Sequence, residues 1–280
     1  MTIKDSGAGP VIDEFSEAFA GHWLYTIFDI YGGYDEFGLH VDSRDLTGMN
    51  TPVGLLRQTR VPQGWTNAVA RFQGAMSKVL RRHIPHHVLV FIDDIGIKTG
   101  QGKCDDTQIQ PGIRKFVADH IAVVKEVMRD LIDAGLTVKV DKCRFGFSEV
   151  IIVGHKCNSK GRGMEEEKVA AIMNWKSCKN LTEVMSFVGL VGFYRIWIAD
   201  FSQIAGPLYK LYKKNVEFVW EEEQKQAMEK LKEAVTRSPV LKAPEYNDAK
   251  RPFFLRTDAS DKGVGSVLEQ CDIEGNRRPC

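Results

Sequence analysis

The cysteines of this chain follow no pattern that would give them a structural role. Six are present, but none forms a Cys-x-x-Cys pair or follows a zinc-finger spacing, although His155 lies two residues before Cys157. Structural zinc sites and disulfide frameworks are recognised by close, regular cysteine spacings. We therefore expect reduced thiols, as in an intracellular protein, and no structural zinc.

Long apolar segments are missing as well. No run approaches the ~20 apolar residues that cross a bilayer. The first residues, Met-Thr-Ile-Lys-Asp-Ser-Gly, contain no apolar signal-peptide core. The sequence therefore predicts a soluble protein of the cytoplasm or the nucleus, with no membrane partner.

Neither sign of charge is in excess. The chain carries 38 basic and 37 acidic side chains, a net charge of +1. This balance excludes a uniformly basic coat for nucleic acid, although it allows a local basic groove. The 280 residues, 43% of them hydrophobic, have an ordinary globular composition and enough length for more than one core.

The hydrophobic pattern changes twice along the chain. Residues 1–160 alternate short strands with helical patterns at 11–20, 68–80 and 113–134, and residues 136–145 alternate like a further strand. Residues 161–245, by contrast, read as a series of helices. A polar stretch then precedes a new strand that begins at Phe253. These changes predict an α+β fold in three parts, with residues 246–280 as the third.

Two adjacent carboxylates end an apolar strand. Residues 88–92 are apolar, Asp93 and Asp94 follow, and an apolar alternation resumes at Ile95. This pattern predicts a strand, a tight turn and a returning strand. Two carboxylates about 4 Å apart repel by roughly 4 kcal/mol at an effective dielectric constant of about 20, so the pair would attract a divalent cation. An ordinary solvated turn is the alternative.

Another carboxylate, Asp29, also follows an apolar strand. Residues 23–28 are apolar and aromatic, Asp29 follows, and the pair Gly32 and Gly33 then indicates a turn. Asp29 could simply terminate its strand. Together with Asp93, however, it would supply the carboxylates from separate strands that a two-metal site requires.

In their order and spacing, three segments resemble motifs of one family. Residues 28–35 read Phe-Asp-Ile-Tyr-Gly-Gly-Tyr-Asp, residues 61–67 read Val-Pro-Gln-Gly-Trp-Thr-Asn, and residues 91–94 read Phe-Ile-Asp-Asp. They are similar to the two palm motifs and the aromatic-x-Asp-Asp signature of reverse transcriptases from long-terminal-repeat retrotransposons. The resemblance is strongest to the Ty3/gypsy class.

The resemblance continues over essentially the whole chain. Residues 136–145 are similar to the palm segment that ends in Lys-Cys-x-Phe, and residues 152–155 to the primer-grip strand. Residues 187–195 resemble the helical thumb and connection, and residues 257–268 the opening strands of an RNase H domain.

The resemblance implies both a fold and an activity. The fold would be a polymerase palm, an antiparallel sheet with packed helices, followed by a helical thumb and connection region and the first strands of an RNase H-like domain. The activity would be RNA-directed DNA polymerisation by two-metal phosphoryl transfer, with Mg²⁺ or Mn²⁺ as cofactor. The implied partners are dNTPs, an RNA or DNA template with its primer, and either a second copy or other parts of the polyprotein.

The resemblance also assigns roles to individual residues. Asp29, Asp93 and Asp94 would be the catalytic carboxylates and metal ligands, and Lys142 would protonate the leaving pyrophosphate. The remaining implied residues are Ile30, Tyr34, Gln63 and Gly64 for the nucleotide, Gly154 and His155 for the primer backbone, and Asp258 as an RNase H carboxylate.

Several of these roles have alternatives. Tyr34 would lie beneath the sugar and exclude a 2′-hydroxyl, or it is an ordinary core tyrosine. Lys139 competes with Lys142 for the general acid, and either could be a solvated strand lysine. Trp65 is expected to pack against its turn and not to stack on a base.

The chain also departs from the family pattern. Only 28 residues precede Asp29, so most of the fingers subdomain is expected to be missing, and the chain to be a fragment. Asp258 alone has a matching RNase H context, so RNA cleavage is not expected. A catalytically defective remnant that binds nucleic acid or a protein remains an alternative. Another Mg²⁺-dependent phosphoryl-transfer or receiver protein would explain Asp-Asp but not Pro-Gln-Gly-Trp.

Overall fold

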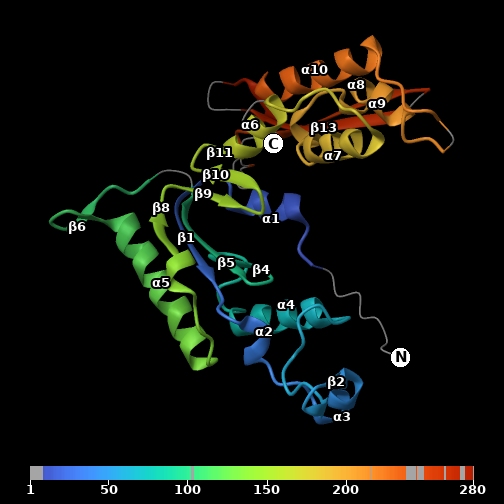
Figure 1. Ribbon diagram of the computed structural model, residues 1–280. Helices are drawn as coiled ribbons and strands as arrows, with labels where there is room; N and C mark the ends of the chain where they lie inside the picture. The colour runs from blue at the N-terminus through green and yellow to red at the C-terminus, as the bar shows by residue number, and fades with distance from the viewer. Residues whose placement is uncertain are drawn as a thin grey trace. The chain divides into compact units, whose positions relative to one another are not determined.

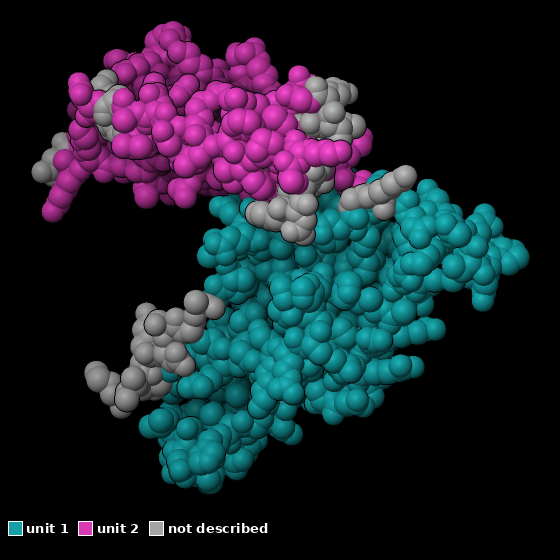
Figure 2. Space-filling model, turned by 180° about the vertical axis from the view of Figure 1, so that it is seen from behind, with its two compact units in different colours: residues 1–152 teal, residues 153–280 magenta. Residues whose placement is uncertain are grey.

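A computed structural model describes residues 9–101, 104–214, 216–237, 244, 249–261, 263–271 and 275–279. The chain forms two compact units, residues 1–152 and 153–280, shown in teal and magenta in Figure 2. Each unit has its own hydrophobic core. The mixture of helices and antiparallel sheets confirms the predicted α+β class (Figure 1).

A four-stranded antiparallel sheet forms the centre of the first unit. Its strands are β1 (His22–Asp29), β4 (Val88–Phe91), β5 (Asp94–Gln101) and β8 (Arg144–Phe147), in the order β4–β5–β1–β8. Phe28, Ile95 and Ile97 are fully buried, as expected for aromatic and β-branched residues in central strands. The two longest strands, β1 and β5, pair along their whole length.

The longer helices in the described part of this unit are α1 (Ile12–Phe19), α4 (Ala68–Val79) and α5 (Lys115–Asp133) (Figure 1). Phe72 and Met76 of α4, and Val124 and Val127 of α5, enter the core formed with the sheet. Their spacing of three or four residues places each pair on one helical face.

Shorter elements complete the first unit. They are α2 (Gly33–Glu36), α3 (Val41–Arg44), η1 (Asp45–Thr47), β2 (Met49–Thr51), β3 (Gly54–Leu56), β6 (Gln108–Gln110), β7 (Ile113–Arg114), η2 (Val140–Lys142) and β9 (Glu149–Ile152). The continuous strand that the alternation of residues 136–145 predicts is not formed. A single bridge joins Val138 to Ile30, and the chain then turns through η2 before β8.

The second unit contains a hairpin, a group of helices and a three-stranded antiparallel sheet. Its elements are β10 (His155–Asn158), β11 (Gly161–Met164), α6 (Glu166–Met173), α7 (Leu181–Gly192), η3 (Arg195–Trp197), α8 (Phe201–Ile204), α9 (Gly206–Lys210), α10 (Glu222–Arg237), β12 (Phe253–Ser260), β13 (Gly263–Cys271) and β14 (Arg277–Pro279).

The β10–β11 hairpin is tied to the helices that follow it. The Tyr194 hydroxyl donates a hydrogen bond to the Gly154 carbonyl at 2.9 Å and accepts one from the Glu165 N–H at 3.3 Å. The units divide between residues 152 and 153, whereas the strand-to-helix change in the sequence suggested residue 160. The second predicted boundary, at residue 245, lies outside the described residues.

Within these described ranges, no helix combines the length and the apolar character that crossing a membrane requires.

Candidate active site

The β4–β5 hairpin has a two-residue turn made of Ile92 and Asp93. Phe91 pairs with Asp94 across the hairpin, so only these two residues connect the strands. Ile92 has a φ of +58°, in the left-handed region. The turn places Asp93 at the exposed tip and Asp94 at the first position of β5.

Asp29 lies beside this hairpin at the end of β1. It is the register partner of Asp94, and the next residue, Ile30, donates its N–H to the Asp93 carbonyl at 3.2 Å. On its other side, the Asp29 carbonyl accepts a hydrogen bond from the Lys139 N–H at 2.8 Å. The structure therefore brings Asp29, Asp93 and Asp94 together at one end of the sheet.

The three acids interact electrostatically. The pKa of Asp94 is raised, first by burial and then by the negative charges of Asp93 and Asp29, while Lys142 lowers it. A carboxyl that is partly desolvated beside two other acids binds a proton or a cation more readily. The acid cluster, defined as Asp29, Asp93 and Asp94, is thus a site that a cation would stabilise.

Lys142 is the lysine that reaches the acid cluster. Its Nζ donates a hydrogen bond to Asp29 Oδ2 at 3.1 Å, and this bond and the Asp29 charge raise the pKa of Lys142. The Nζ of Lys139 lies instead 4.0 Å from Asp141 Oδ2. Of the two lysines that the sequence left open, only Lys142 pairs with an acid of the cluster.

Tyr34 lies between the hydrophobic core and the acid cluster. Its ring stacks on Phe72 with centroids 4.6 Å apart, and the pKa of its hydroxyl is raised by burial and by the charge of Asp93. Gly33 permits this arrangement, because a Cβ at that position would lie 2.6 Å from Phe72 Cζ. Tyr34 therefore makes the packing contacts expected of a core tyrosine, and it also has the acidic neighbour expected of a residue in the nucleotide site.

The other predicted nucleotide contacts differ in exposure. The side chain of Ile30 is only 4% exposed and belongs to the core, so only its backbone could contact a ligand. Gln63 and Gly64 form an exposed turn, in which the Trp65 N–H donates to the Pro62 carbonyl at 3.2 Å. Gly64 has a φ of +82°, which favours glycine.

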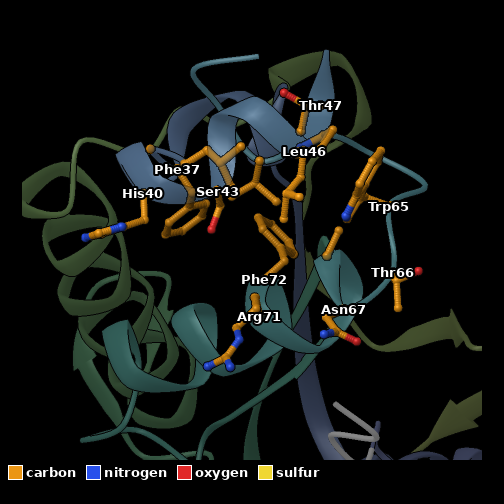
Figure 3. A pocket seen from close by; sticks show the side chains of 15 residues that line it. Phe37, His40, Ser43, Leu46, Thr47, Trp65, Thr66, Asn67, Arg71 and Phe72 are labelled. Atoms are coloured by element: carbon orange, nitrogen blue, oxygen red, sulfur yellow. The ribbon is translucent and has the colours of Figure 1, made fainter. Parts of the chain in front are cut away.

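A cavity of about 390 Å³ lies beside this turn. Figure 3 shows Phe72 among the lining side chains, with Trp65 on one side and Phe37 and Leu46 nearby. Trp65 is 41% exposed, so it lines the cavity and is not enclosed in the core.

Three predicted site residues belong to the second unit. Gly154, with a φ of +78°, precedes β10. His155 is only 1% exposed, and its ring stacks on Phe193 and Trp197 with centroids 4.9 and 5.2 Å away. A primer could therefore contact the backbone here but not the imidazole. Asp258 is exposed on β12, opposite Gly265.

Gln73 of α4 contacts the β4–β5 hairpin, and the sequence analysis did not single it out. Its Oε1 accepts a hydrogen bond from the Ile92 N–H at 2.6 Å, and its Nε2 donates one to the Val90 carbonyl at 2.9 Å. The sequence does contain a pattern that could have identified Gln73. It lies four residues after Val69 and three before Met76, so it is a polar residue within an apolar helical stripe.

The oxygen donors of the acid cluster fit a hard divalent cation. Among the residues that the structure describes, however, no three or more acidic, histidine or cysteine side chains are placed so that they could hold a metal ion by themselves. Mg²⁺ usually keeps several waters and is held by one or two carboxylates together with substrate phosphates. The donor set therefore fits Mg²⁺ or the similar Mn²⁺, with ligands completed by substrate.

Two family models match the chain. The model for reverse transcriptase (RNA-dependent DNA polymerase) matches residues 4–181, which is more than half of the chain. The model for an RNase H-like domain found in reverse transcriptase matches residues 220–280. The second match begins before the predicted start at residue 246 and includes α10.

Transposon polyproteins are similar to most of the chain. The transposon Tf2-3 polyprotein of Schizosaccharomyces pombe is 30% identical over 93% of this chain. The retrovirus-related Pol polyprotein from transposon 297 of Drosophila melanogaster is 30% identical over 96% of it. The chain spans 18% of the first polyprotein and 24% of the second.

Solved structures share the fold. The foamy viral protease-reverse transcriptase dRH in complex with double-stranded DNA has a TM-score of 0.80 and 23% identity. The match covers 99% of this chain and 45% of the viral chain. The foamy viral protease-reverse transcriptase in complex with an RNA/DNA hybrid has a TM-score of 0.79 and 23% identity, and the match covers 99% of this chain and 35% of the viral chain. This likeness establishes the fold.

Proposed function

This chain belongs to the reverse transcriptase (RNA-dependent DNA polymerase) family, and from that premise we propose that its first unit is the catalytic palm of a retrotransposon polymerase. The reaction would add deoxynucleotides to a primer paired with an RNA template. The observation that carries the proposal is the register of Asp29 with Asp94, which gathers three acids and Lys142 at one sheet end.

Reverse transcriptases generally use divalent metal ions, and we assign Mg²⁺ or Mn²⁺ to this site. Asp29 and Asp93 would be the first ligands, and Asp94 would complete the set. The bound cation would neutralise charge on the reacting phosphates. Lys142 would hold a proton near the leaving pyrophosphate, and its raised pKa keeps the ammonium charged.

Nucleotide selection would depend on Tyr34 and on the exposed turn before α4. The Tyr34 ring, supported from behind by Phe72, would leave no room for a 2′-hydroxyl. Gln63 and Gly64 would contact the incoming nucleotide and the template through an amide and a close backbone. Ile30 would contribute only through its backbone, because its side chain is buried.

Template and primer binding is proposed from two sources. The foamy viral relatives were solved with double-stranded DNA and with an RNA/DNA hybrid. In this chain, the backbone at Gly154 and His155 would contact the primer. Association with a second copy or with other parts of a polyprotein stays a prediction.

Primer extension on an RNA template tests the proposal. Asp93→Asn should reduce Mg²⁺-dependent dNTP incorporation by about 10³-fold or more, because a metal ligand loses its charge. Asp141→Asn is the matched control, since Asp141 is an exposed acid next to Lys142. Full activity of Asp93→Asn would contradict the assignment. A wild-type chain that binds template and primer but adds no nucleotide would support a non-catalytic binding role instead.

A further inference from the structure

The backbone of the catalytic turn is strained at Ile92. A φ of +58° is unfavourable for any residue with a Cβ and most unfavourable for a β-branched one. Two-residue hairpin turns usually place glycine, asparagine or aspartate at such positions. Strain of this kind persists only where surrounding contacts hold it, and it concentrates at functional sites.

Gln73 supplies such contacts from α4. Its amide oxygen accepts the Ile92 N–H at 2.6 Å, while its amide nitrogen donates to the Val90 carbonyl at 2.9 Å. A carboxamide can accept a hydrogen bond through its oxygen and donate one through its nitrogen at the same time. The two bonds attach to the hairpin on either side of Phe91, so they constrain both the strand end and the turn.

The turn is held from its other side by β1. The Ile30 N–H donates to the Asp93 carbonyl at 3.2 Å. Asp93 therefore lies in a turn whose first residue is held by Gln73 and whose second residue is held by Ile30. Removal of Gln73 would leave only one of these restraints and an unfavourable φ at Ile92.

We propose that Gln73 is a positioning residue, which holds the strained Ile92 turn so that Asp93 faces Asp29. This inference rests on the proposed polymerase function. Residue 72, its neighbour on α4, stacks on Tyr34. One helix thus sets the position of both the sugar-facing ring and a metal-binding carboxylate.

The test is a double-mutant cycle in primer extension. Gln73→Met removes both hydrogen bonds at similar volume and should lower kcat by about tenfold, with little change in the KM for dNTP. In an Ile92→Gly background, the same change should cost less than about threefold, because glycine adopts positive φ without steric cost. Lys78→Met, on the exposed side of the same helix, is the control and should leave kcat unchanged.

Each outcome decides the inference. A Gln73→Met enzyme as active as wild type would overturn it while leaving the polymerase function intact. A loss that Ile92→Gly fails to reduce, accompanied by a lower melting temperature, would assign Gln73 to general packing and also overturn it. A wild-type chain without polymerase activity would contradict the proposed function instead.

Hydrogen exchange at the Ile92 amide tests the positioning contact independently of activity. The Ile92 N–H should exchange at least about tenfold faster in Gln73→Met than in wild type or Lys78→Met, because its acceptor has been removed. Unchanged protection in Gln73→Met would overturn the inference even in an inactive chain.

Discussion

Tyr34 illustrates how one residue can serve the core and the site together. Replacement by valine should raise ribonucleotide incorporation relative to deoxynucleotide incorporation by at least about tenfold, because the ring that we propose excludes the 2′-hydroxyl is lost. Single-nucleotide extension with matched ribo and deoxy substrates measures the ratio. Tyr31→Val is the control, since Tyr31 is 60% exposed. An unchanged ratio would leave Tyr34 with only its packing role against Phe72.

Lys142 makes a prediction about pH. Its hydrogen bond to Asp29 raises the pKa of the ammonium, so Lys142 stays protonated to a higher pH than an ordinary lysine. If Lys142 is the general acid, kcat/KM should fall at high pH as the ammonium loses its proton. Lys142→Met should lower the rate by about 10²-fold or more and remove this high-pH decline.

Lys139→Met is the matched comparison for Lys142. Lys139 lies three residues earlier, and its Nζ approaches Asp141 and not the acid cluster. The Lys139 variant should retain both the rate and the high-pH decline. A larger loss in Lys139→Met than in Lys142→Met would transfer the general-acid role to Lys139.

At the scale of elements, His120 connects α5 to two strands of the sheet. Its Nε2 lies 2.8 Å from Thr26 Oγ1 on β1, and its Nδ1 lies 2.7 Å from Thr99 Oγ1 on β5. Burial lowers the pKa of His120 from 6.5 to about 4. The imidazole therefore stays neutral in the folded protein at a pH where the unfolded chain binds a proton.

The consequence is a loss of stability in mild acid. Because the unfolded state takes up the proton first, the free energy of unfolding should be greatest above pH 6.5 and fall as the pH approaches about 4. The shift corresponds to roughly 3 kcal/mol at most. Urea unfolding at pH 7 and pH 4.5 measures the difference. The difference in the free energy of unfolding between the two pH values should be smaller in His120→Gln than in wild type. It should be unchanged in His86→Gln, because His86 is exposed. An equal difference in both variants would contradict this explanation.

Elements with strong local patterns were predictable. The helical spacing of residues 68–80 became α4 (Ala68–Val79), and the strand, Asp-Asp turn and returning strand became β4 and β5. The alternation of residues 136–145 predicted a continuous strand, which is not formed. Only a single bridge joins Val138 to Ile30, and the chain then turns into η2. A strand forms only where another strand pairs with it, and the alternation of one segment does not identify the partner strand.

At the scale of the whole molecule, the order of the motifs carried the identification. The predicted resemblance to Ty3/gypsy retrotransposons is confirmed by the reverse transcriptase family match and by the Tf2-3 and 297 polyproteins. The chain spans less than a quarter of either polyprotein's length. For this chain, polymerase activity is therefore a proposal. The expectation that Asp258 alone does not support RNA cleavage stays a prediction.

The sequence by itself determined the α+β class, the order of strands and helices around the palm motifs, and the identity of the acids. These features follow from periodicity and from short motifs, which neighbouring residues encode. Only the tertiary structure decided that Lys142 meets Asp29 across 113 positions, that Gln73 holds the Ile92 turn, and that the His155 ring is buried. Such contacts join distant segments, so they depend on how the chain packs and not on any local pattern.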